Sequence, residues 1–246
     1  MPLLEIHRLT KSFGQMVAVD QVDLAIAAGQ LTAVIGPNGA GKTTLFNVIT
    51  GKLQPTMGRV TFRGEDITGF SPHAIVSRGI ARSFQVTNVF PELTVVDNLR
   101  VAVLSAQRYA GRHGWRGGSD GATVEVARLL QELGLQPHAE LPCAVLSHAH
   151  QRLVEIGLAL GGHPRLLLLD EPTAGMGLAE TVAMTYFIRN LAQREGLTVV
   201  LIEHDMQVVF ALAERVVVMH QGRIIADGAP AVVRDDPLVR AAYLGQ

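Results

Sequence analysis

The sequence predicts an α/β fold with a mostly parallel sheet, on three observations. Apolar segments of strand length alternate along the chain with segments of helical periodicity. Two of these segments, RLLLLD at 165–170 and LTVVLIEH at 197–204, are too apolar for half-exposed strands, which suits central strands covered on both faces. A glycine-rich turn, GPNGAGKT at 36–43, follows one predicted strand and opens a predicted helix.

The N-terminal part of this pattern contains both kinds of element. Apolar composition predicts a buried strand at 31–36, and 44–50 is expected to be a helix. Residues 59–67 alternate like a strand with a turn, and 79–85 is predicted to be a shorter strand.

The middle of the chain, from about 87 to 162, has no clear strand and is predicted to be a helical insert. Within it, 92–104 has helical spacing, and 123–135 is expected to be a helix with Gly134 near its end. The glycines and basic residues of 105–122 favour a solvated loop over a lipid-binding or partner-binding arm.

The C-terminal part returns to alternation. An amphipathic helix is predicted at 180–196 and another helix at 206–216. Residues 216–228 are expected to form a pair of strands that turn at Gln221 and Gly222. The chain has no internal repeat, so the pattern predicts one domain rather than an array.

Composition limits the classes of function. The 246 residues are 48% hydrophobic, and 21 basic against 22 acidic residues give a net charge of −1, so no global attraction to nucleic acid or an anionic membrane is expected. A single cysteine, Cys143, excludes an internal disulfide and fits a reducing compartment. No signal peptide and no apolar run of spanning length are recognised, so we expect a soluble chain whose membrane role depends on a partner.

The segment GPNGAGKT matches the full phosphate-binding pattern G-x-x-x-x-G-K-[ST] between a strand and a helix. Glycines let successive backbone N–H groups point at phosphate oxygens, and the helix N-terminus adds positive potential. The side chain of Lys42 is expected to reach the β- and γ-phosphates, and Thr43 to offer its hydroxyl to Mg²⁺. The predicted nucleotide-binding residues are Gly36, Pro37, Asn38, Gly39, Ala40, Gly41, Lys42, Thr43 and Thr44.

Two acids follow the apolar strand at 165–170. Asp170 would place a carboxylate where Mg²⁺ lies beside the phosphate-binding loop, and Glu171 could polarise water for attack on the γ-phosphate. Acid pairs after strands are common, so this interpretation depends on the phosphate-binding loop.

Three single residues gain meaning only beside these motifs. His204 ends a strand, where the ligand crevice of an open α/β sheet is found, and there it could contact phosphate or water. Gln85 lies at the entry to the helical insert, and Phe13 could stack on a base, although ordinary core packing explains Phe13 equally well.

The stretch LSHAHQ at 146–151 has two interpretations. Ser147 precedes residues with helical spacing, as an N-cap does. The stretch also lies shortly before the strand at 165–170. In that position LSHAHQ itself could be a phosphate-binding element that lacks its usual glycines.

Together these segments resemble the nucleotide-binding subunit of an ATP-binding cassette (ABC) transporter, in the family's order and over essentially the whole chain. The resemblance implies ATP and Mg²⁺ as cofactors and one ABC ATPase domain over 1–246. In it, a P-loop NTPase core with a mostly parallel sheet and an antiparallel β portion (1–86 and 163–246) is interrupted by a helical signature subdomain (87–162).

The same resemblance implies a role for each matched residue. Glu171, His204 and Gln85 would be catalytic, and Thr43, Gln85 and Asp170 would hold the metal. Nucleotide contacts would come from the P-loop, from Phe13 as the adenine-stacking aromatic, and from Ser147, Ala149 and His150 of the signature segment; Thr173–Gly177 would form the D-loop.

A narrower resemblance covers the Q-loop region and most of the second half. ARSFQVTNVFPELTVVDNL, EPTAGMGLAET and DPLVRAAYLG resemble the subunits serving importers of branched-chain and other hydrophobic amino acids. Close relatives of these subunits serve urea or amide uptake, so the transported solute stays open.

The family implies a head-to-tail pair of ATPase subunits, with each ATP between one chain's P-loop and the other's signature segment. The partners would be integral-membrane permease subunits, an identical or sister ATPase and, indirectly, a solute-binding protein, with no nucleic acid; the chain would lie peripherally at the cytoplasmic face of the inner or cell membrane. Ala149 stands where the family has glycine, and His150 where Gln, Glu or Asp is usual. These departures predict a weaker site at the partner's P-loop, with His150 as imidazolium offsetting part of the loss.

Three alternatives stay open. A non-transport ABC protein acting on ribosomes or DNA usually has two cassettes or a long coiled-coil insert, and this chain has one cassette and no heptad run. An export-side ATPase for lipid or polysaccharide has a similar sequence, although SFQ and AGM favour import. A cassette that binds ATP but hydrolyses it poorly, because of Ala149, is the third.

Overall fold

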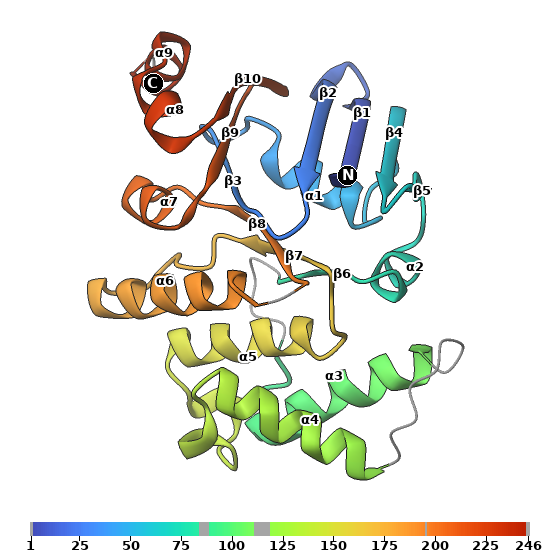
Figure 1. The fold of residues 1–246 in the computed structure, drawn as a ribbon, viewed down its shortest axis with the longest axis vertical. Coiled ribbons are helices and arrows are strands. Elements are labelled where there is room, and N and C mark those ends of the chain that lie inside the picture. Colours follow the sequence, from blue (N-terminus) through green and yellow to red (C-terminus); the bar gives the residue numbers. More distant parts are fainter. Residues whose placement is uncertain (1, 84–88, 111–118, 195, 245–246) are drawn as a thin grey trace.

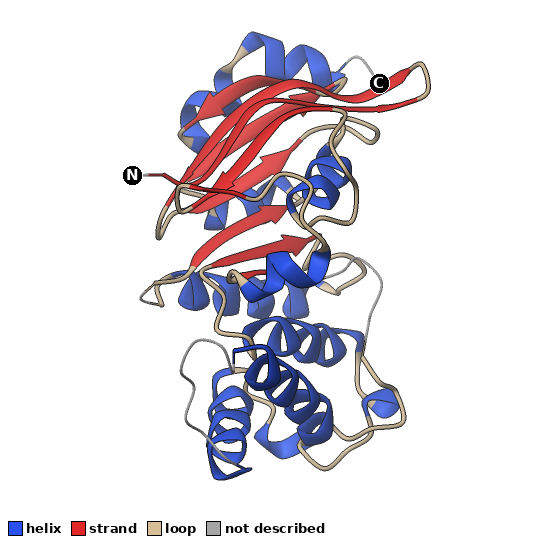
Figure 2. Cartoon of the chain, turned by 90° about the vertical axis from the view of Figure 1, so that its right-hand side faces the viewer, coloured by secondary structure: helices blue, strands red, loops and turns tan. Residues whose placement is uncertain are grey.

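The structure is a computed structural model that describes residues 2–83, 89–110, 119–194 and 196–244. Among these residues no helix combines the length and apolar character needed to cross a membrane. Figure 2 shows strands gathered in one half of the molecule and a group of helices in the other.

A six-stranded sheet forms the centre of the strand-rich half, in the order β10-β9-β3-β8-β7-β6. Neighbouring strands from β9 to β6 are parallel, and only β10 runs antiparallel, to β9. The mostly parallel sheet predicted from the sequence is therefore confirmed. Its strands are β3 (Leu31–Ile35), β6 (Ile80–Arg82), β7 (Leu166–Asp170), β8 (Thr198–Ile202), β9 (Arg215–His220) and β10 (Arg223–Gly228).

The central strands are buried on both faces because their side chains alternate between two hydrophobic clusters. In β7, Leu167 and Leu169 belong to the cluster shared with the helices, whereas Leu166 and Leu168 belong to the cluster shared with the second sheet. This two-sided burial explains why 165–170 and 197–204 are continuous apolar runs.

The second sheet is antiparallel, in the order β2-β1-β4-β5. Its strands are β1 (Pro2–Phe13), β2 (Met16–Ala27), β4 (Met57–Phe62) and β5 (Glu65–Asp66). Of this second sheet, the sequence pattern predicted only the strand with a turn at 59–67, which corresponds to β4 and β5. The long strands β1 and β2 were not predicted, because register shifts and the left-handed residues Arg8 and Gln21 interrupt their alternation.

Helices cover the sheets on several sides (Figure 1). Side chains of α1 pack in the cluster between the two sheets, and those of α6, α7 and α8 pack in the other cluster. These helices, with the shorter α2 and the C-terminal α9, are α1 (Lys42–Ile49), α2 (Pro72–Ser77), α6 (Leu178–Ala192), α7 (Met206–Leu212), α8 (Pro230–Asp235) and α9 (Pro237–Leu244).

The remaining helices form the lower group in Figure 1: α3 (Val95–Ala110), α4 (Ser119–Glu132) and α5 (His148–Leu160). Two short 3-10 turns, Gln136–His138 and Cys143–Val145, join α4 to α5. The expectation of a loop over 105–122 is wrong at both ends, because α3 continues to Ala110 and α4 begins at Ser119. Residues 105–110 contain good helix formers, and the buried Ala122 anchors the first turns of α4.

Candidate nucleotide and metal site

The phosphate-binding loop connects β3 to α1 at the edge of the sheet where the parallel strands end. Gly36 and Gly41 have φ values of 146° and 102°, which other residues rarely adopt. A Cβ at Gly36 would overlap the carbonyl oxygen of Met219, and one at Gly41 would overlap that of Ala18. The close approach of β2 and β9 therefore requires both glycines.

Lys42 is buried at the base of this loop, at the start of α1. Its Nζ donates to the carbonyl oxygens of Gly36 at 2.6 Å and Pro37 at 3.0 Å. Burial lowers the pKa of its ammonium, while the charges of Glu171 and Asp170 act in the opposite direction. Lys42 and the two acids at the end of β7 therefore lie close enough for their charges to interact.

The rest of the loop faces outward. Asn38, Gly39 and Thr43 are exposed, Gly41 and Thr44 are half-buried, and Pro37 and Ala40 are buried beneath them. The N–H groups at the start of α1 and the hydroxyl of Thr43 thus lie at an accessible helix N-terminus, which favours anions.

Asp170 ends β7 with its side chain fully buried. Its Oδ2 accepts a hydrogen bond from Nη2 of Arg82 at 2.5 Å. Its Oδ1 is buried and has no hydrogen-bond partner among the described residues. A carboxylate oxygen that is buried but not satisfied by the protein fits a Mg²⁺ ligand, since Mg²⁺ prefers oxygen donors.

Glu171 and His204 meet across the ends of β7 and β8. Oε1 of Glu171 lies 3.0 Å from Nε2 of His204. Glu171 has a φ of 48°, which is unusual for a residue with a side chain, and its N–H donates to the carbonyl of Ile202 at 2.9 Å. The structure thus brings Asp170, Glu171 and His204 to the P-loop edge of the sheet.

Ser147 is the N-cap of α5, as one of the two interpretations predicted. Its Oγ accepts from the backbone N–H of His150 at 3.3 Å. Ala149 lies in the first turn with ordinary helical backbone, so its β-carbon imposes no backbone strain there.

His150 lies in the first turn of α5, beside the ring of His138. Burial lowers its pKa, and the nearby ring of His138, whose centroid lies 4.3 Å away, lowers it further. These two effects favour the uncharged imidazole in the chain by itself, and an imidazolium beside the partner's phosphate stays a prediction.

Phe13 ends β1 at the turn into β2, with 44% of its surface exposed and Nζ of Lys11 5.0 Å from its ring centroid. Its exposure agrees with a stacking surface better than with core packing. Gln85 lies outside the described residues; the preceding strand β6 ends at Arg82.

With this geometry in place, comparison with known proteins decides the family. The model described as ABC transporter matches residues 19–174, more than half of the chain. The chain belongs to the ABC transporter family. A second model, described as Branched-chain amino acid ATP-binding cassette transporter, matches residues 223–246 of this ABC chain.

Curated relatives match the ABC chain over nearly its full length. It is 40% identical to the high-affinity branched-chain amino acid transport ATP-binding protein BraF of Pseudomonas aeruginosa and 36% identical to LivG of Escherichia coli, with 100% of this chain and 98% of each relative covered. It is also 32% identical to the lipopolysaccharide export system ATP-binding protein LptB of Acidithiobacillus ferridurans, over 99% of this chain and 97% of that protein.

Solved structures confirm the predicted ABC-type fold class. A nucleotide-free ATP-binding cassette from an ABC transporter superposes with a TM-score of 0.87 at 31% identity, over 100% of both chains. The ADP conformation of an ATP-binding cassette of an ABC transporter gives a TM-score of 0.87 at 32% identity, again over 100% of both chains.

Sequence reasoning missed charged residues that support this ABC site, among them Arg82 and Glu203. Arg82 holds Asp170, and the buried Glu203 accepts from the N–H of Thr173 at 3.1 Å and from its Oγ1 at 2.5 Å. The other carboxylate oxygen of Glu203 accepts from the N–H of His204 at 2.9 Å. Glu203 therefore ties the segment after Glu171 to the histidine. The available signal was a charged residue inside a short buried strand or at its end.

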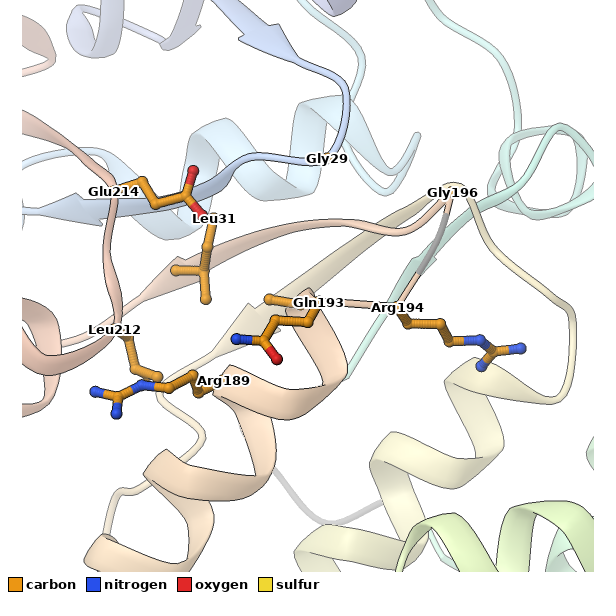
Figure 3. A pocket seen from close by; sticks show the side chains of 9 residues that line it. Gly29, Leu31, Arg189, Gln193, Arg194, Gly196, Leu212 and Glu214 are labelled. Atoms are coloured by element: carbon orange, nitrogen blue, oxygen red, sulfur yellow. The ribbon is translucent and has the colours of Figure 1, made fainter.

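A cavity of about 310 Å³ lies elsewhere (Figure 3). Leu31 begins β3 and Glu214 precedes β9, so this cavity opens at the edge opposite the P-loop. None of the predicted site residues that the structure describes lines it.

Proposed function

We propose that this ABC ATPase hydrolyses ATP to power an importer of branched-chain amino acids. The observation that carries the function is the meeting of P-loop, Asp170, Glu171 and His204 at one edge of the sheet. Support for the solute class comes from the model matching 223–246 and from the names of BraF and LivG.

In the proposed mechanism the P-loop amides and the Lys42 ammonium bind the β- and γ-phosphates. Thr43, Asp170 and Gln85 would hold Mg²⁺, which would supply positive charge beside the phosphates. Glu171 accepts the hydrogen bond of the attacking water and polarises it. His204, 3.0 Å from Glu171, orients that carboxylate and the γ-phosphate.

The site is completed by a second ABC ATPase subunit, identical or sister, in a head-to-tail dimer. The signature residues Ser147, Ala149 and His150 face the partner's nucleotide, and Phe13 stacks on the adenine of the chain's own ATP. We infer that 87–162 forms the signature subdomain and that 1–86 and 163–246 form the catalytic core. The exposed, one-sided P-loop supports this arrangement.

The remaining partners follow from transport. Two integral-membrane permease subunits bind the ATPase pair at the cytoplasmic face of the membrane, and a solute-binding protein delivers the solute to the permease without touching this chain. The resemblance to LptB keeps an export ATPase for lipopolysaccharide as the second candidate.

Purification in detergent and transport assays separate these candidates. A tagged chain should bring down two permease subunits and a sister ATPase, and proteoliposomes of this complex with its solute-binding protein should accumulate labelled leucine when ATP is enclosed. Urea is the control solute, and the matched Glu171→Gln complex should not accumulate leucine. Stimulation of ATPase activity by lipopolysaccharide, with no leucine uptake, would contradict the importer function and support the export ATPase.

A further inference from the structure

Arg152 connects the helix of the signature segment to the catalytic loop. It lies on α5, five residues after the N-cap Ser147, and only 3% of it is exposed. Its Nη2 donates to two consecutive backbone carbonyls, those of Asp170 at 3.0 Å and Glu171 at 2.9 Å. One guanidinium nitrogen of Arg152 thus holds the backbone of both acids at the C-terminal end of β7.

The guanidinium is fixed from its other side by Glu155. Nη1 of Arg152 donates to Oε2 of Glu155 at 2.7 Å, and both side chains are buried. A buried ion pair gives little net stability relative to apolar residues of the same volume, because both charges lose their hydration. The ion pair is better explained by its effect on position, because Glu155 fixes the orientation of the Arg152 guanidinium. The planar guanidinium is suited to two directed hydrogen bonds.

Glu171 is the residue whose backbone needs such support. Its φ of 48° is a left-handed conformation that residues with a Cβ rarely adopt. The N–H of Glu171 is held by the carbonyl of Ile202 in β8, and its C=O is held by Arg152. These two hydrogen bonds on opposite sides of the Cα fix the direction of the Cα–Cβ bond, and through it the carboxylate that lies 3.0 Å from His204.

We propose that Arg152 is a positioning residue for ATP hydrolysis: by holding the carbonyl of Glu171, it keeps the catalytic carboxylate in the direction needed to polarise water. The proposal rests on the proposed function only in so far as Glu171 is the catalytic base. A misplacement of about 1 Å in such a group lowers a rate by about 100-fold, whereas ATP binding through the P-loop does not depend on it.

The alternative is a structural role, in which Arg152 only joins α5 to the core. A variant with Met at 152 and Leu at 155 separates the two roles. It replaces the buried pair by apolar residues of similar volume, so no charge is left buried and the fold is retained. The carbonyl of Glu171 nevertheless loses its donor.

The matched control is the pair Glu125 and Arg128 on α4. It is also an ion pair three residues apart on one helix, with 2.5 Å between Nη2 and Oε1, and it lies away from the catalytic loop. The control variant carries Glu125→Leu and Arg128→Met, the same substitutions at the second pair.

The experiment measures ATP hydrolysis by the purified complex, ATP affinity by titration, and thermal unfolding. For Arg152→Met with Glu155→Leu we expect kcat to fall about 10- to 100-fold, with ATP affinity and KM within about threefold of the unmodified complex and unfolding at a similar temperature. Arg152→Lys, which keeps one donor near the carbonyls, should recover part of kcat. The control variant should keep its kcat.

Full kcat in the variant with Met at 152 and Leu at 155 would overturn the proposal, and so would a loss of kcat matched by an equal loss of ATP affinity. If either variant at 152 fails to fold, Glu155→Gln provides the test. This substitution weakens the hold on the Arg152 guanidinium but keeps a hydrogen-bond acceptor. An unchanged kcat in Glu155→Gln would also overturn the proposal. None of the three measurements depends on the transported solute, so the result stands whether or not the solute is an amino acid.

Discussion

Arg82 donates from Nη2 to Oδ2 of Asp170 at 2.5 Å, and from Nη1 of the same guanidinium to Oδ1 of Asn47 at 2.7 Å. The interaction joins β6, β7 and α1 directly beneath the P-loop. The side chains of Arg82 and Asp170 are 6% and 0% exposed, so the carboxylate that is proposed to hold Mg²⁺ depends on Arg82 for its charge balance inside the protein.

Arg82→Met should therefore destabilise the chain by about 3–5 kcal/mol, because it leaves the buried carboxylate of Asp170 without its cation. Urea unfolding of the purified subunit measures this loss. Arg100→Met is the control, since Arg100 forms an exposed pair with Asp97, and it should leave the urea midpoint nearly unchanged. A loss below about 1 kcal/mol for Arg82→Met would show that Asp170 does not rely on Arg82.

Lys42→Ala should weaken nucleotide binding by about 10- to 150-fold, since a charged hydrogen bond contributes about 1.5–3 kcal/mol. Lys42 is the buried cation of the P-loop, and its ammonium donates to the carbonyl oxygens of Gly36 and Pro37 in that loop. Titration with ATP, with circular dichroism as the control for folding, tests this. An unchanged affinity in a folded variant would exclude Lys42 from phosphate binding.

Glu171→Gln should keep ATP affinity and lower turnover by about 10²- to 10⁴-fold, the usual effect of removing a general base. The amide preserves the shape of the side chain and can still hydrogen-bond to His204, so binding and folding are not expected to change. Steady-state hydrolysis by the assembled complex measures the loss. Near-full activity would mean that another group polarises the water.

The extent to which sequence predicts this molecule depends on how local each signal is. Leu166–Leu169 identify a buried strand because every residue is apolar, and Lys42 is identified by a contiguous motif. The strands β1 and β2 escape such a pattern: in β1 the buried residues Leu4 and Ile6 are two apart, but the next, Leu9, is three further on because a bulge intervenes.

The roles of the charged residues that support the site could not be predicted from the sequence for a different reason. Arg82 lies 88 residues from Asp170, Glu203 lies 30 residues from Thr173, and Arg152 lies 19 residues from Glu171. No short spacing connects these partners, and each interaction exists only after the strands have been placed side by side. Composition could at most mark a charge within or beside a buried segment as unusual.

His150 should have a pKa below the ordinary value of about 6.5. Burial disfavours its charged form, and His138 adds a repulsion that Glu180 only partly offsets. Because the folded pKa is lowered, the contribution of His150 to stability is complete above about pH 6.5 and is lost as the pH falls through the folded pKa. NMR titration of the imidazole should show this pKa, and His138→Gln should raise it.

The pH dependence of unfolding provides a second test, in which the unmodified chain is compared with His150→Gln. Between about pH 7 and pH 5 the unfolding free energy of the unmodified chain should decline more steeply than that of His150→Gln, which lacks the titrating group. A pKa of His150 at or above 6.5, or equal slopes in the two proteins, would show that burial and the contact with His138 do not disfavour its charged form in solution.

The last prediction concerns Ala149, where the family has glycine. If glycine were needed for its backbone, Ala149 would strain the loop and slow hydrolysis at the partner's P-loop. Instead Ser147 has the extended backbone of an N-cap, with φ −61° and ψ 157°, and α5 begins at His148, so Ala149 has the helical conformation that alanine favours. Its N–H stays available to an anion at the helix N-terminus.

Ala149→Gly should therefore change hydrolysis at either site by less than about threefold and should lower stability by up to about 1 kcal/mol through helix propensity. Hydrolysis by the complex is measured with each P-loop lysine replaced in turn, which isolates the two sites. A gain of tenfold or more at the site built on the partner's P-loop, with none at the Lys42 site, would show that the β-carbon of Ala149 obstructs the γ-phosphate and that the two sites are unequal.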